Sequence, residues 1–329
     1  GPTMAAAKIV ILCLAALPSG IAALRTSRLA PTPSRVPIAP ARAPAPCMLR
    51  TFYDVVVIGG GPVGVTAALR AASLGRTALL VDATPAQQYQ FTGPTGLYSK
   101  ALRDSALRID VPVLRSMGIS DVAIWAQLQE FISNILRKSG ENNMGALEAS
   151  RVPHLRGVGK LLPAEETDGV VVEVSFLQQR AKKQSILINA NNVVLATGSR
   201  AVQLSALEGW YGLPISGHPR VFDSDSIKGL SFLPRSVVII GGGIIAVEFA
   251  RIFAALAAEV TLVIRAGDLP SSLARVGIDR AIGFVLQADL QEAGVQIAFE
   301  TEVVDCAFAR EQPTQYVSRR AGGAAAGSD

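Results

Sequence analysis

The stretch that decides the fold is Gly59-Gly60-Gly61-Pro62-Val63-Gly64, which follows an apolar run over residues 54–58. A helical stretch over 65–74 comes next, and a second apolar run ends at Asp82. The first glycine permits a tight strand-to-helix turn, the second lets backbone approach a pyrophosphate, and the third lets helix and strand pack closely. The pattern predicts a βαβ dinucleotide-binding unit in which Gly59, Gly61 and Gly64 hold the diphosphate and Asp82 accepts from ribose hydroxyls.

The same unit recurs later in the chain. An apolar run over residues 236–240 enters Gly241-Gly242-Gly243-Ile244-Ile245-Ala246, and a helix and a second apolar run follow. The separation from the first glycine to the end of the second strand is 23 residues in both copies. Gly241, Gly243 and Ala246 take the three small-residue positions here, but the strand ends on Ile264-Arg265 instead of an acid. An arginine at this place suits the 2′-phosphate of NADP(H), and the alternative is a solvated surface arginine.

Charge is distributed unevenly along the 329 residues, which leave room for about two domains of ~150 residues each. The first 53 residues carry six cations and no acid, so the rest has 25 Lys and Arg against 26 acids, a net charge of −1. This neutral body gives no support for nucleic-acid binding. Three cysteines and two histidines exclude a disulfide framework and leave no metal site to predict.

The N-terminal segment is typical of a targeting sequence. Lys8 precedes a nine-residue apolar run over 9–17 that ends at Pro18, and small residues follow. The run is far shorter than the ~20 residues of a transmembrane helix. Residues 25–46 are rich in Pro, Ala, Ser and Arg. The two parts together resemble the bipartite presequence of algae whose plastid lies inside extra membranes; a mitochondrial presequence and a disordered tail of a cytosolic protein are the alternatives.

Several motifs carry a family resemblance. The chain resembles the pyridine nucleotide-disulfide oxidoreductases in four features. These are the two such units 182 residues apart, Ser99-Lys100-Ala101-Leu102-Arg103, Leu195-Ala196-Thr197-Gly198-Ser199-Arg200 and the stretch from His218 to Ile227. These are flavoproteins with two dinucleotide-binding domains, and the chain is most similar to soluble pyridine nucleotide transhydrogenase and dihydrolipoamide dehydrogenase. Residues 243–248 resemble glutathione reductase. The resemblance covers residues 52–305 and implies FAD in the first unit and a nicotinamide nucleotide in the second.

The resemblance sets the expected architecture. It implies an α/β fold of two Rossmann-like, three-layer FAD- and NAD(P)-binding domains, the second inserted after the first and truncated at the C-terminus. The expected division is a disordered presequence over 1–47, an FAD-binding-like domain over 48–205, an NAD(P)-binding-like domain over 206–305 and a low-complexity tail over 306–329. Lys100, Thr197, Gly198 and Glu248 are further expected cofactor-site residues. Lys100 and Glu248 are expected to form an ion pair beside the flavin, across the domain boundary.

The chain departs from the family where the chemistry lies. On the register that matches Asp82 and Lys100, the two redox cysteines fall on Phe91 and Gly96, so thiol–disulfide exchange is excluded. Gln88, Tyr89 and Gln90 stand where the family has small residues beside the flavin diphosphate, which predicts that FAD, if bound, is bound weakly. The segment that holds the flavin ribityl chain and the dimerisation domain with its His–Glu dyad are also missing.

These features leave three hypotheses open. The first is a non-catalytic accessory subunit of an organellar, for example thylakoid, complex, which would need no cofactor and would meet a membrane only through that complex. The second is a flavin-dependent NAD(P)H oxidoreductase that exchanges hydride without a redox disulfide, with no certain catalytic residue. The third is a truncated fragment of such an enzyme. Fold alone does not decide among them.

Overall fold

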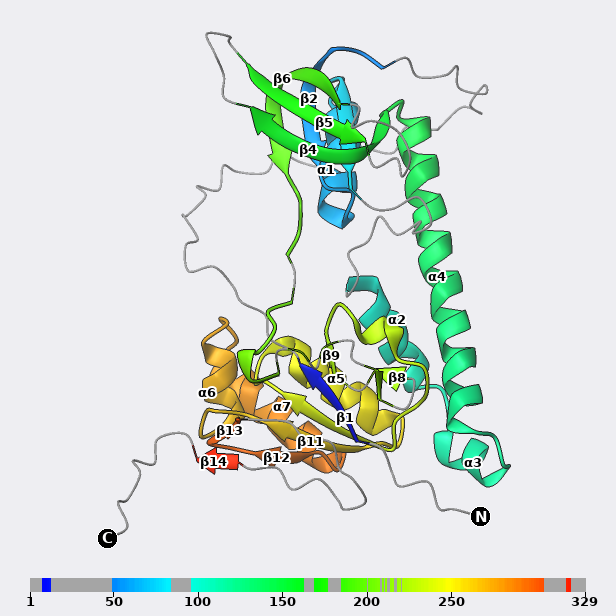
Figure 1. Cartoon of the computed structure of the whole chain (residues 1–329), viewed down its shortest axis with the longest axis vertical. Helices are drawn as coiled ribbons and strands as arrows, with labels where there is room; N and C mark the ends of the chain where they lie inside the picture. The colour runs from blue at the N-terminus through cyan, green and yellow to red at the C-terminus, as the bar shows by residue number, and fades with distance from the viewer. Residues whose placement is uncertain are drawn as a thin grey trace. The chain divides into compact units, whose positions relative to one another are not determined.

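The computed structural model describes residues 8–12, 49–83, 96–162, 169–176, 185–199, 201–207, 209, 211, 214–215, 218–219, 221–304 and 318–320. Its chain divides into two compact units (Figure 1). The first comprises residues 1–17, 95–133 and 200–329, and the second comprises residues 18–94 and 134–199. Each glycine turn lies in a different unit.

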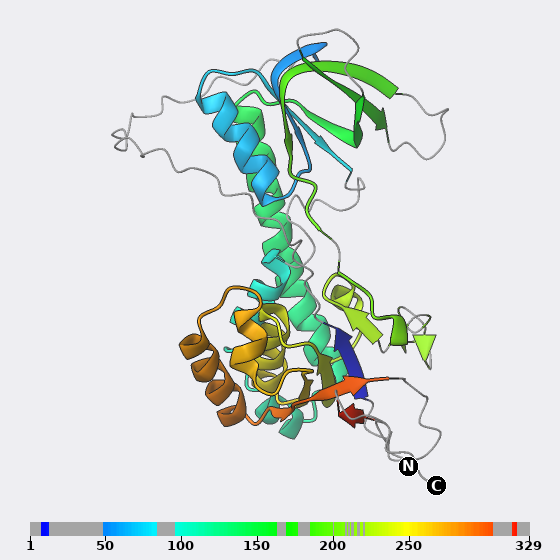
Figure 2. The same ribbon diagram turned by 90° about the vertical axis from the view of Figure 1, so that its left-hand side faces the viewer.

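The unit that carries the first glycine turn is built on one five-stranded sheet. Its strands are β2 (Phe52–Ile58), β3 (Ala78–Asp82), β4 (His154–Leu162), β5 (Val170–Phe176) and β6 (Ser185–Leu195). Strand β2 pairs in parallel with β3 and β6, β3 pairs in parallel with β4, and two antiparallel pairings through β5 close the sheet into a barrel. Helix α1 (Pro62–Ser73), bright blue in Figure 2, packs beside these strands.

Side chains along β2 and β3 point alternately to the two faces of this sheet, which explains why both faces are apolar. Val56 packs with the cluster that includes Tyr53 and Leu79, whereas Val57 packs with α1 and Leu80 in a second cluster. Successive side chains of a strand point to opposite faces, so a continuous apolar run buries both. The expected strands at 54–58 and 77–81 and the helix between them are confirmed within a few residues.

The other unit contains a five-stranded parallel sheet in the order β12-β11-β10-β1-β9. Its strands are β1 (Lys8–Leu12), β9 (Val221–Asp223), β10 (Ser236–Ile240), β11 (Glu259–Val263) and β12 (Gln296–Ala298). The helices α5 (Ile244–Ala255), α6 (Leu269–Ala274) and α7 (Arg280–Glu292), yellow to orange in Figure 2, lie beside the strands. The second βαβ unit, β10-α5-β11, is therefore confirmed at its predicted position.

Short elements complete this unit. They are the 3-10 helices η1 (Ser205–Leu207) and η2 (Ile227–Gly229), the antiparallel pair β7 (Pro214–Ile215) and β8 (His218–Pro219), and the antiparallel pair β13 (Thr301–Val303) and β14 (Ser318–Arg320). The low-complexity tail was expected to remain unpacked. That expectation is wrong for β14, which pairs with β13 over its three residues.

The largest correction concerns residues 8–12. The presequence was expected to lack tertiary structure, but Lys8–Leu12 forms β1, which pairs in parallel with β10 on one edge and β9 on the other. The expectation is wrong for these five residues. The physical reason is that β-branched and aliphatic residues suit a strand buried inside a parallel sheet as well as they suit the apolar core of a targeting sequence.

Helices α2 (Gly96–Ala106) and α3 (Val111–Ser116) and the start of α4 (Asp121–Ala149) also belong to the unit with β10. The predicted domain over 48–205 is thus wrong for residues 95–133. The contacts explain the difference: the indole N–H of Trp125, 1% exposed, donates to the carbonyl oxygen of Leu230 at 2.6 Å. The Trp125 ring stacks on Phe253 of α5 with centroids 6.5 Å apart.

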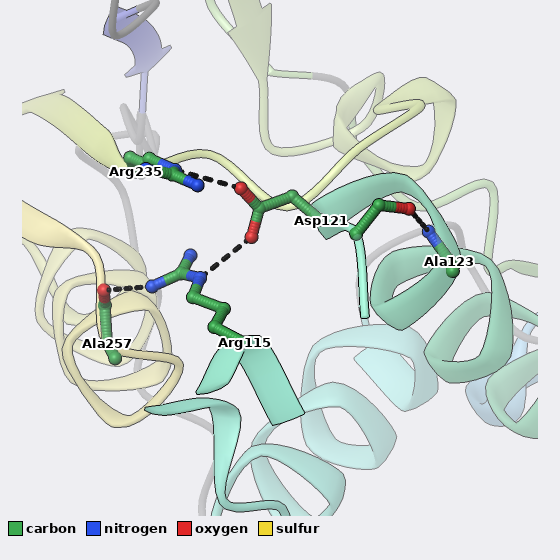
Figure 3. Close-up of polar contacts among 6 residues, drawn as sticks. Arg115, Asp121, Ala123, Arg235 and Ala257 are labelled. Carbon is green, nitrogen blue, oxygen red and sulfur yellow. Dashed lines mark hydrogen bonds and ion pairs between the residues drawn. The ribbon is translucent and has the colours of Figure 1, made fainter. Parts of the chain in front are cut away.

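A carboxylate strengthens the same attachment (Figure 3). Asp121 accepts from Arg115 Nε at 2.8 Å and from Arg235 Nε at 3.0 Å, and Arg115 also donates to the Ala257 carbonyl oxygen at 3.1 Å. Burial, the largest single effect, would raise the pKa of Asp121, but the hydrogen bonds and charges of Arg115 and Arg235 together hold that pKa below its usual value. The start of α4 is therefore fixed to the loops before β10 and β11.

Among the helices of the described ranges, none is long and apolar enough to cross a membrane.

Candidate functional site: two glycine turns

The first turn joins β2 to α1. Gly59 has φ +111°, in the left-handed region that L side chains avoid. A Cβ at Gly59 would lie 2.2 Å from the Ala196 carbonyl oxygen, and a Cβ at Gly64 would lie 1.8 Å from the Gly59 carbonyl oxygen. Both positions are therefore closed to any larger residue, as the sequence predicted.

The same turn meets the end of β6 and opens α1. A Cβ at Gly59 would also lie 2.9 Å from the Thr197 nitrogen, so the turn and the segment Thr197-Gly198 are immediate neighbours. Gly61 is the N-cap of α1, and no side chain caps the helix. The amide groups of a first helical turn lack intrahelical acceptors, so they suit an anionic group such as a diphosphate.

Asp82 is the acid at the end of β3. Its side chain is almost buried, and Oδ1 accepts a 2.9 Å hydrogen bond from the backbone N–H of Gly60. Asp82, which was expected to bind the ribose hydroxyls, is thus already hydrogen-bonded to the turn, although a carboxylate has further acceptor sites. Burial lowers the pKa of His154, which β4 places beside β3; the charge of Asp82 opposes this shift and that of Arg156 adds to it.

The second turn joins β10 to α5 with similar geometry. Gly241 has φ +130°, Gly243 is the N-cap of α5 without a side-chain cap, and Ala246 is fully buried. A Cβ at Gly242 would lie 2.2 Å from Ser272 Oγ and 2.9 Å from Ile264 Cγ2, whereas a Cβ at Gly243 would meet no atom within 4 Å. Gly243 therefore faces open space, as a glycine approached by a ligand should.

A cavity of about 260 Å³ opens on this second turn. Its lining includes Gly243, Arg265, Ser272, Arg275 and Glu302. Both arginines are exposed, and no acid within the described ranges forms an ion pair with either. Two free guanidinium groups beside a glycine turn can bind a phosphate through charge-assisted hydrogen bonds.

Arg275 and Ser272 were missed by the sequence analysis. Arg275 is the C-cap of α6, whose N-cap Asp268 accepts from the backbone of Ser271. The run Asp268-Leu269-Pro270 is a typical helix start and could have indicated that a short helix returns the chain to the turn. Arg265 was predicted, and the structure places it with Arg275 at one cavity.

The expected ion pair between Lys100 and Glu248 is not formed. Lys100 is exposed, and no salt bridge joins it to Glu248 among the residues that the structure describes. Glu248 Oε2 instead accepts from Ser99 Oγ at 3.3 Å. Both residues belong to the same compact unit, so the expected contact across a domain boundary is also wrong. The adjacent Ser99 is buried and faces α5, which leaves Lys100 on the solvent side of α2.

Tyr98 is a second residue of α2 that the sequence did not single out. It is 3% exposed, its hydroxyl accepts from Gln129 Nε2 at 2.6 Å, and burial raises its pKa to about 12. The phenol therefore stays neutral at physiological pH and supports the packing of α2 on α4.

Of the two positions at which the family resemblance expects redox cysteines, Gly96 lies within the described residues and Phe91 does not. Gly96 begins α2 and is exposed, while Phe91, Gln88, Tyr89 and Gln90 lie outside the described residues. The three cysteines, Cys13, Cys47 and Cys306, also lie outside them. Within the described ranges, no group of three or more His, Cys, Asp or Glu could hold a metal ion.

Known proteins are similar to this chain in sequence. Soluble pyridine nucleotide transhydrogenase from Pseudomonas putida is 32% identical over 225 residues, which cover 67% of this chain and 45% of that protein. The transhydrogenase of a Marinomonas species is 31% identical over 257 residues, 76% of this chain and 50% of that protein. The chain thus spans about half the length of these relatives.

Solved structures support the fold. The HOCl-induced flavoprotein disulfide reductase RclA from Escherichia coli, as a Cu(II) complex, matches with a TM-score of 0.56 and 22% identity over 82% of this chain and 55% of that one. LpdA from Mycobacterium tuberculosis matches with a TM-score of 0.56 and 20% identity over 78% of this chain and 52% of that one. The model of the pyridine nucleotide-disulphide oxidoreductases matches residues 53–319. This chain therefore belongs to the pyridine nucleotide-disulphide oxidoreductase family, which binds FAD and NAD(P)H.

Proposed function

We propose that this protein is a non-catalytic, NADP(H)-binding member of its family that serves as an accessory subunit of an organellar assembly. The observation that carries the proposal is the cavity at the second glycine turn, where Arg265 and Arg275 have no ion-pair partner among the described residues. The family's redox-cysteine positions hold Phe91 and Gly96. The chain thus keeps a nucleotide site and lacks the thiols that would use it for disulfide reduction.

The strand end favours NADP(H) over NAD(H). An acid at this place accepts from the free ribose hydroxyls of NAD, but β11 is followed by Ile264 and Arg265. A 2′-phosphate between Arg265 and Arg275 would neutralise two exposed cations. Glu302 lines the same cavity and would repel a phosphate placed beside it, so the phosphate should lie on the arginine side.

The flavin site is proposed to be weak. Gly59 and Gly64 retain the close packing that a diphosphate needs, so the first turn fits the group. FAD, when bound, supplies hydride acceptance. In this chain Asp82 already accepts from Gly60, and the sequence has Gln88, Tyr89 and Gln90 where the family resemblance expects small residues. Leaving one polar group unpaired there would cost ~1–3 kcal/mol, up to about a hundredfold in affinity.

The location and partners are likewise proposed from the sequence. The basic leader supports a plastid, with the mitochondrion as the alternative, and the neutral body supports protein partners over nucleic acid. A membrane would be met only through the partner complex. Fractionation of cells that express the tagged full chain, followed by identification of the co-purified proteins, tests this part.

The nucleotide part is tested by equilibrium titration of the full chain with NADPH and with NADH. We expect NADPH to bind at least about tenfold more tightly, because each charged hydrogen bond to the phosphate contributes ~1.5–3 kcal/mol. Arg265→Gln and Arg275→Gln should each weaken NADPH binding about tenfold to a hundredfold and leave NADH unchanged. Arg280→Gln is the matched control, since Arg280 contacts Asp268 and Ser271 instead of the cavity. Equal affinity for both nucleotides would overturn the assignment.

A second function is favoured by the intact first turn. If Gly59, Gly61 and Gly64 hold FAD firmly, the chain is a flavin-dependent NAD(P)H oxidoreductase that exchanges hydride without a disulfide, on its own or as part of a longer protein. Retention of stoichiometric FAD after extensive dialysis would favour this function over the accessory role.

A further inference from the structure

Helix α7 is held to its unit by contacts with α6 and α5. Gly283 packs so closely on α6 that a Cβ there would lie 2.6 Å from a backbone atom of that helix. Gln287 Oε1 accepts from the backbone N–H of Leu269 in α6 at 3.1 Å. On another side, Asp289 forms a 3.1 Å ion pair with Arg251 of α5. These contacts determine which side of α7 faces outward.

The outward side of α7 is apolar. Ala281, Phe284, Val285 and Ala288 share it, because residues spaced i, i+3, i+4 and i+7 lie on one side of a helix. All four are exposed, Phe284 by 55% and Val285 by 68%, and Ile282 beside them is 54% exposed. A surface helix normally carries polar residues on this side. These four residues, called the α7 face below, lie on the outside of their unit (Figure 2).

Two charges on α7 stand at the unfavourable ends of the helix. Arg280 is its first residue and Glu292 its last, whereas the helix dipole favours anions at the N-terminus and cations at the C-terminus. Within the described ranges, the ion pair of Arg280 with Asp268 is long, at 3.5 Å, and Glu292 forms none. Both charges would therefore be stabilised by an opposite charge from another molecule.

A second copy of α7, placed antiparallel against the first, supplies these opposite charges. Arg280 and Glu292 each lie six residues from the middle of the helix, so each meets the other at the same level of the pair. Phe284 and Ala288 each lie two residues from the middle, so the large ring meets a small residue. The two Val285 side chains meet near the two-fold axis. The α7 face is thus complementary to itself in both charge and size.

We propose that the α7 face is an interface between two copies of this chain, packed antiparallel, with Arg280 of each copy beside Glu292 of the other. The helix has only 13 residues, so the buried area stays below the ~1,200 Å² of a standard interface. The dimer is therefore weak and forms reversibly as the concentration rises. The face is formed by α7 alone, so it depends neither on the nucleotide sites nor on the edge strands of the sheets.

Sedimentation equilibrium of the full chain over a wide range of concentrations tests the proposal. We expect a monomer–dimer equilibrium whose dissociation constant rises at least about tenfold in Phe284→Glu, since two charges would replace two apolar contacts. Phe131→Glu is the matched control, because Phe131 lies on α4 and is 54% exposed, and it should leave the equilibrium unchanged. A chain that stays monomeric at every concentration would overturn the proposal, as would equal effects of the two variants.

A charge exchange makes the test specific for the antiparallel register. Glu292→Arg places like charges together at both ends of the pair and should weaken the dimer about tenfold. Adding Arg280→Glu restores opposite charges with their positions exchanged, so the double variant should dimerise about as the parent chain does. If each change merely disturbed α7, the two effects would add instead. A double variant weaker than Glu292→Arg alone, with circular dichroism unchanged, would contradict this register.

Discussion

The backbone N–H of Gly60 donates a 2.9 Å hydrogen bond to Oδ1 of Asp82. A Cβ on Gly60 would lie 2.6 Å from Asp82 Cγ, and a Cβ on Gly242 would lie 2.9 Å from Ile264 Cγ2. Asp82 and Ile264 hold equivalent places, 23 residues after the first glycine of each turn. In both units the middle glycine is therefore required by the residue at the end of the next strand, acidic in one unit and apolar in the other.

The Asp82 contact predicts a specific loss of stability. Asp82→Ala leaves the buried Gly60 N–H without this acceptor, so the free energy of unfolding should fall by ~1–3 kcal/mol. Asp82→Asn keeps an acceptor oxygen and should lose less. Urea unfolding of the three proteins, monitored by circular dichroism, measures the difference; equal losses for Ala and Asn would contradict the role of this hydrogen bond.

Two glycines of the second turn, Gly242 and Gly243, allow a controlled comparison, because only Gly242 is closely surrounded by other atoms. Gly242→Ala places a methyl group against Ser272 and Ile264, and such overpacking should lower the free energy of unfolding by ~1–3 kcal/mol. Gly243→Ala meets open space, so stability should hardly change while the new methyl group weakens NADPH binding at the cavity. Thermal unfolding and NADPH titration of both variants separate the effects. A stable Gly243→Ala protein with unchanged NADPH affinity would argue against nucleotide binding at this turn.

The two glycine turns could be predicted from the sequence because their geometry depends on residues that are close together in the chain. The 23-residue spacing and the glycines constrain a few neighbouring residues, and the structure places them as predicted. The position of 95–133 was not accessible in this way, because it depends on long-range contacts such as that of Trp125 with Leu230. Strand β1 was missed for a related reason: an apolar run of five residues has the same composition in a leader and in a parallel sheet.

The Asp121 contacts predict how the attachment of α4 responds to mutation. Asp121→Asn leaves Arg115, whose side chain is only 22% exposed, without its charged partner, and should lower the free energy of unfolding by ~1–3 kcal/mol. Glu141→Gln is the control, because its pair with Arg137 is 56–58% exposed and should contribute ~0.3–0.5 kcal/mol. Losses of similar size in both variants would contradict the special role of Asp121.

The same contact has a pH dependence with a defined sign. The pKa of Asp121 is lowered in the folded state, so its stabilising effect is present above the unfolded carboxyl pKa of ~3.9 and is lost as pH falls through the folded pKa. The difference in Tm between the parent chain and Asp121→Asn should therefore be largest near pH 7 and shrink as the pH falls below the unfolded carboxyl pKa of ~3.9. A difference that grows on acidification would refute this.

Disulfide substrates should not be reduced. Phe91 and Gly96 stand at the two redox positions, and neither can form a thiolate. Purified full chain, supplied with FAD and NADPH, is expected to show no turnover of lipoamide or oxidised glutathione above a sample without protein. Restoring both cysteines, as Phe91→Cys with Gly96→Cys, tests whether the rest of the site still supports the chemistry.

The central claim is that the chain binds NADPH without consuming it. The most direct measurement follows the near-ultraviolet absorbance of NADPH in the presence of the full chain, added FAD and a quinone or a nicotinamide acceptor, with binding recorded in the same sample by nucleotide fluorescence. The account predicts a saturable change in fluorescence, lost in Arg265→Gln, and an absorbance that stays constant over many binding lifetimes. Sustained NADPH oxidation that depends on FAD and on this protein would contradict it and identify a working oxidoreductase.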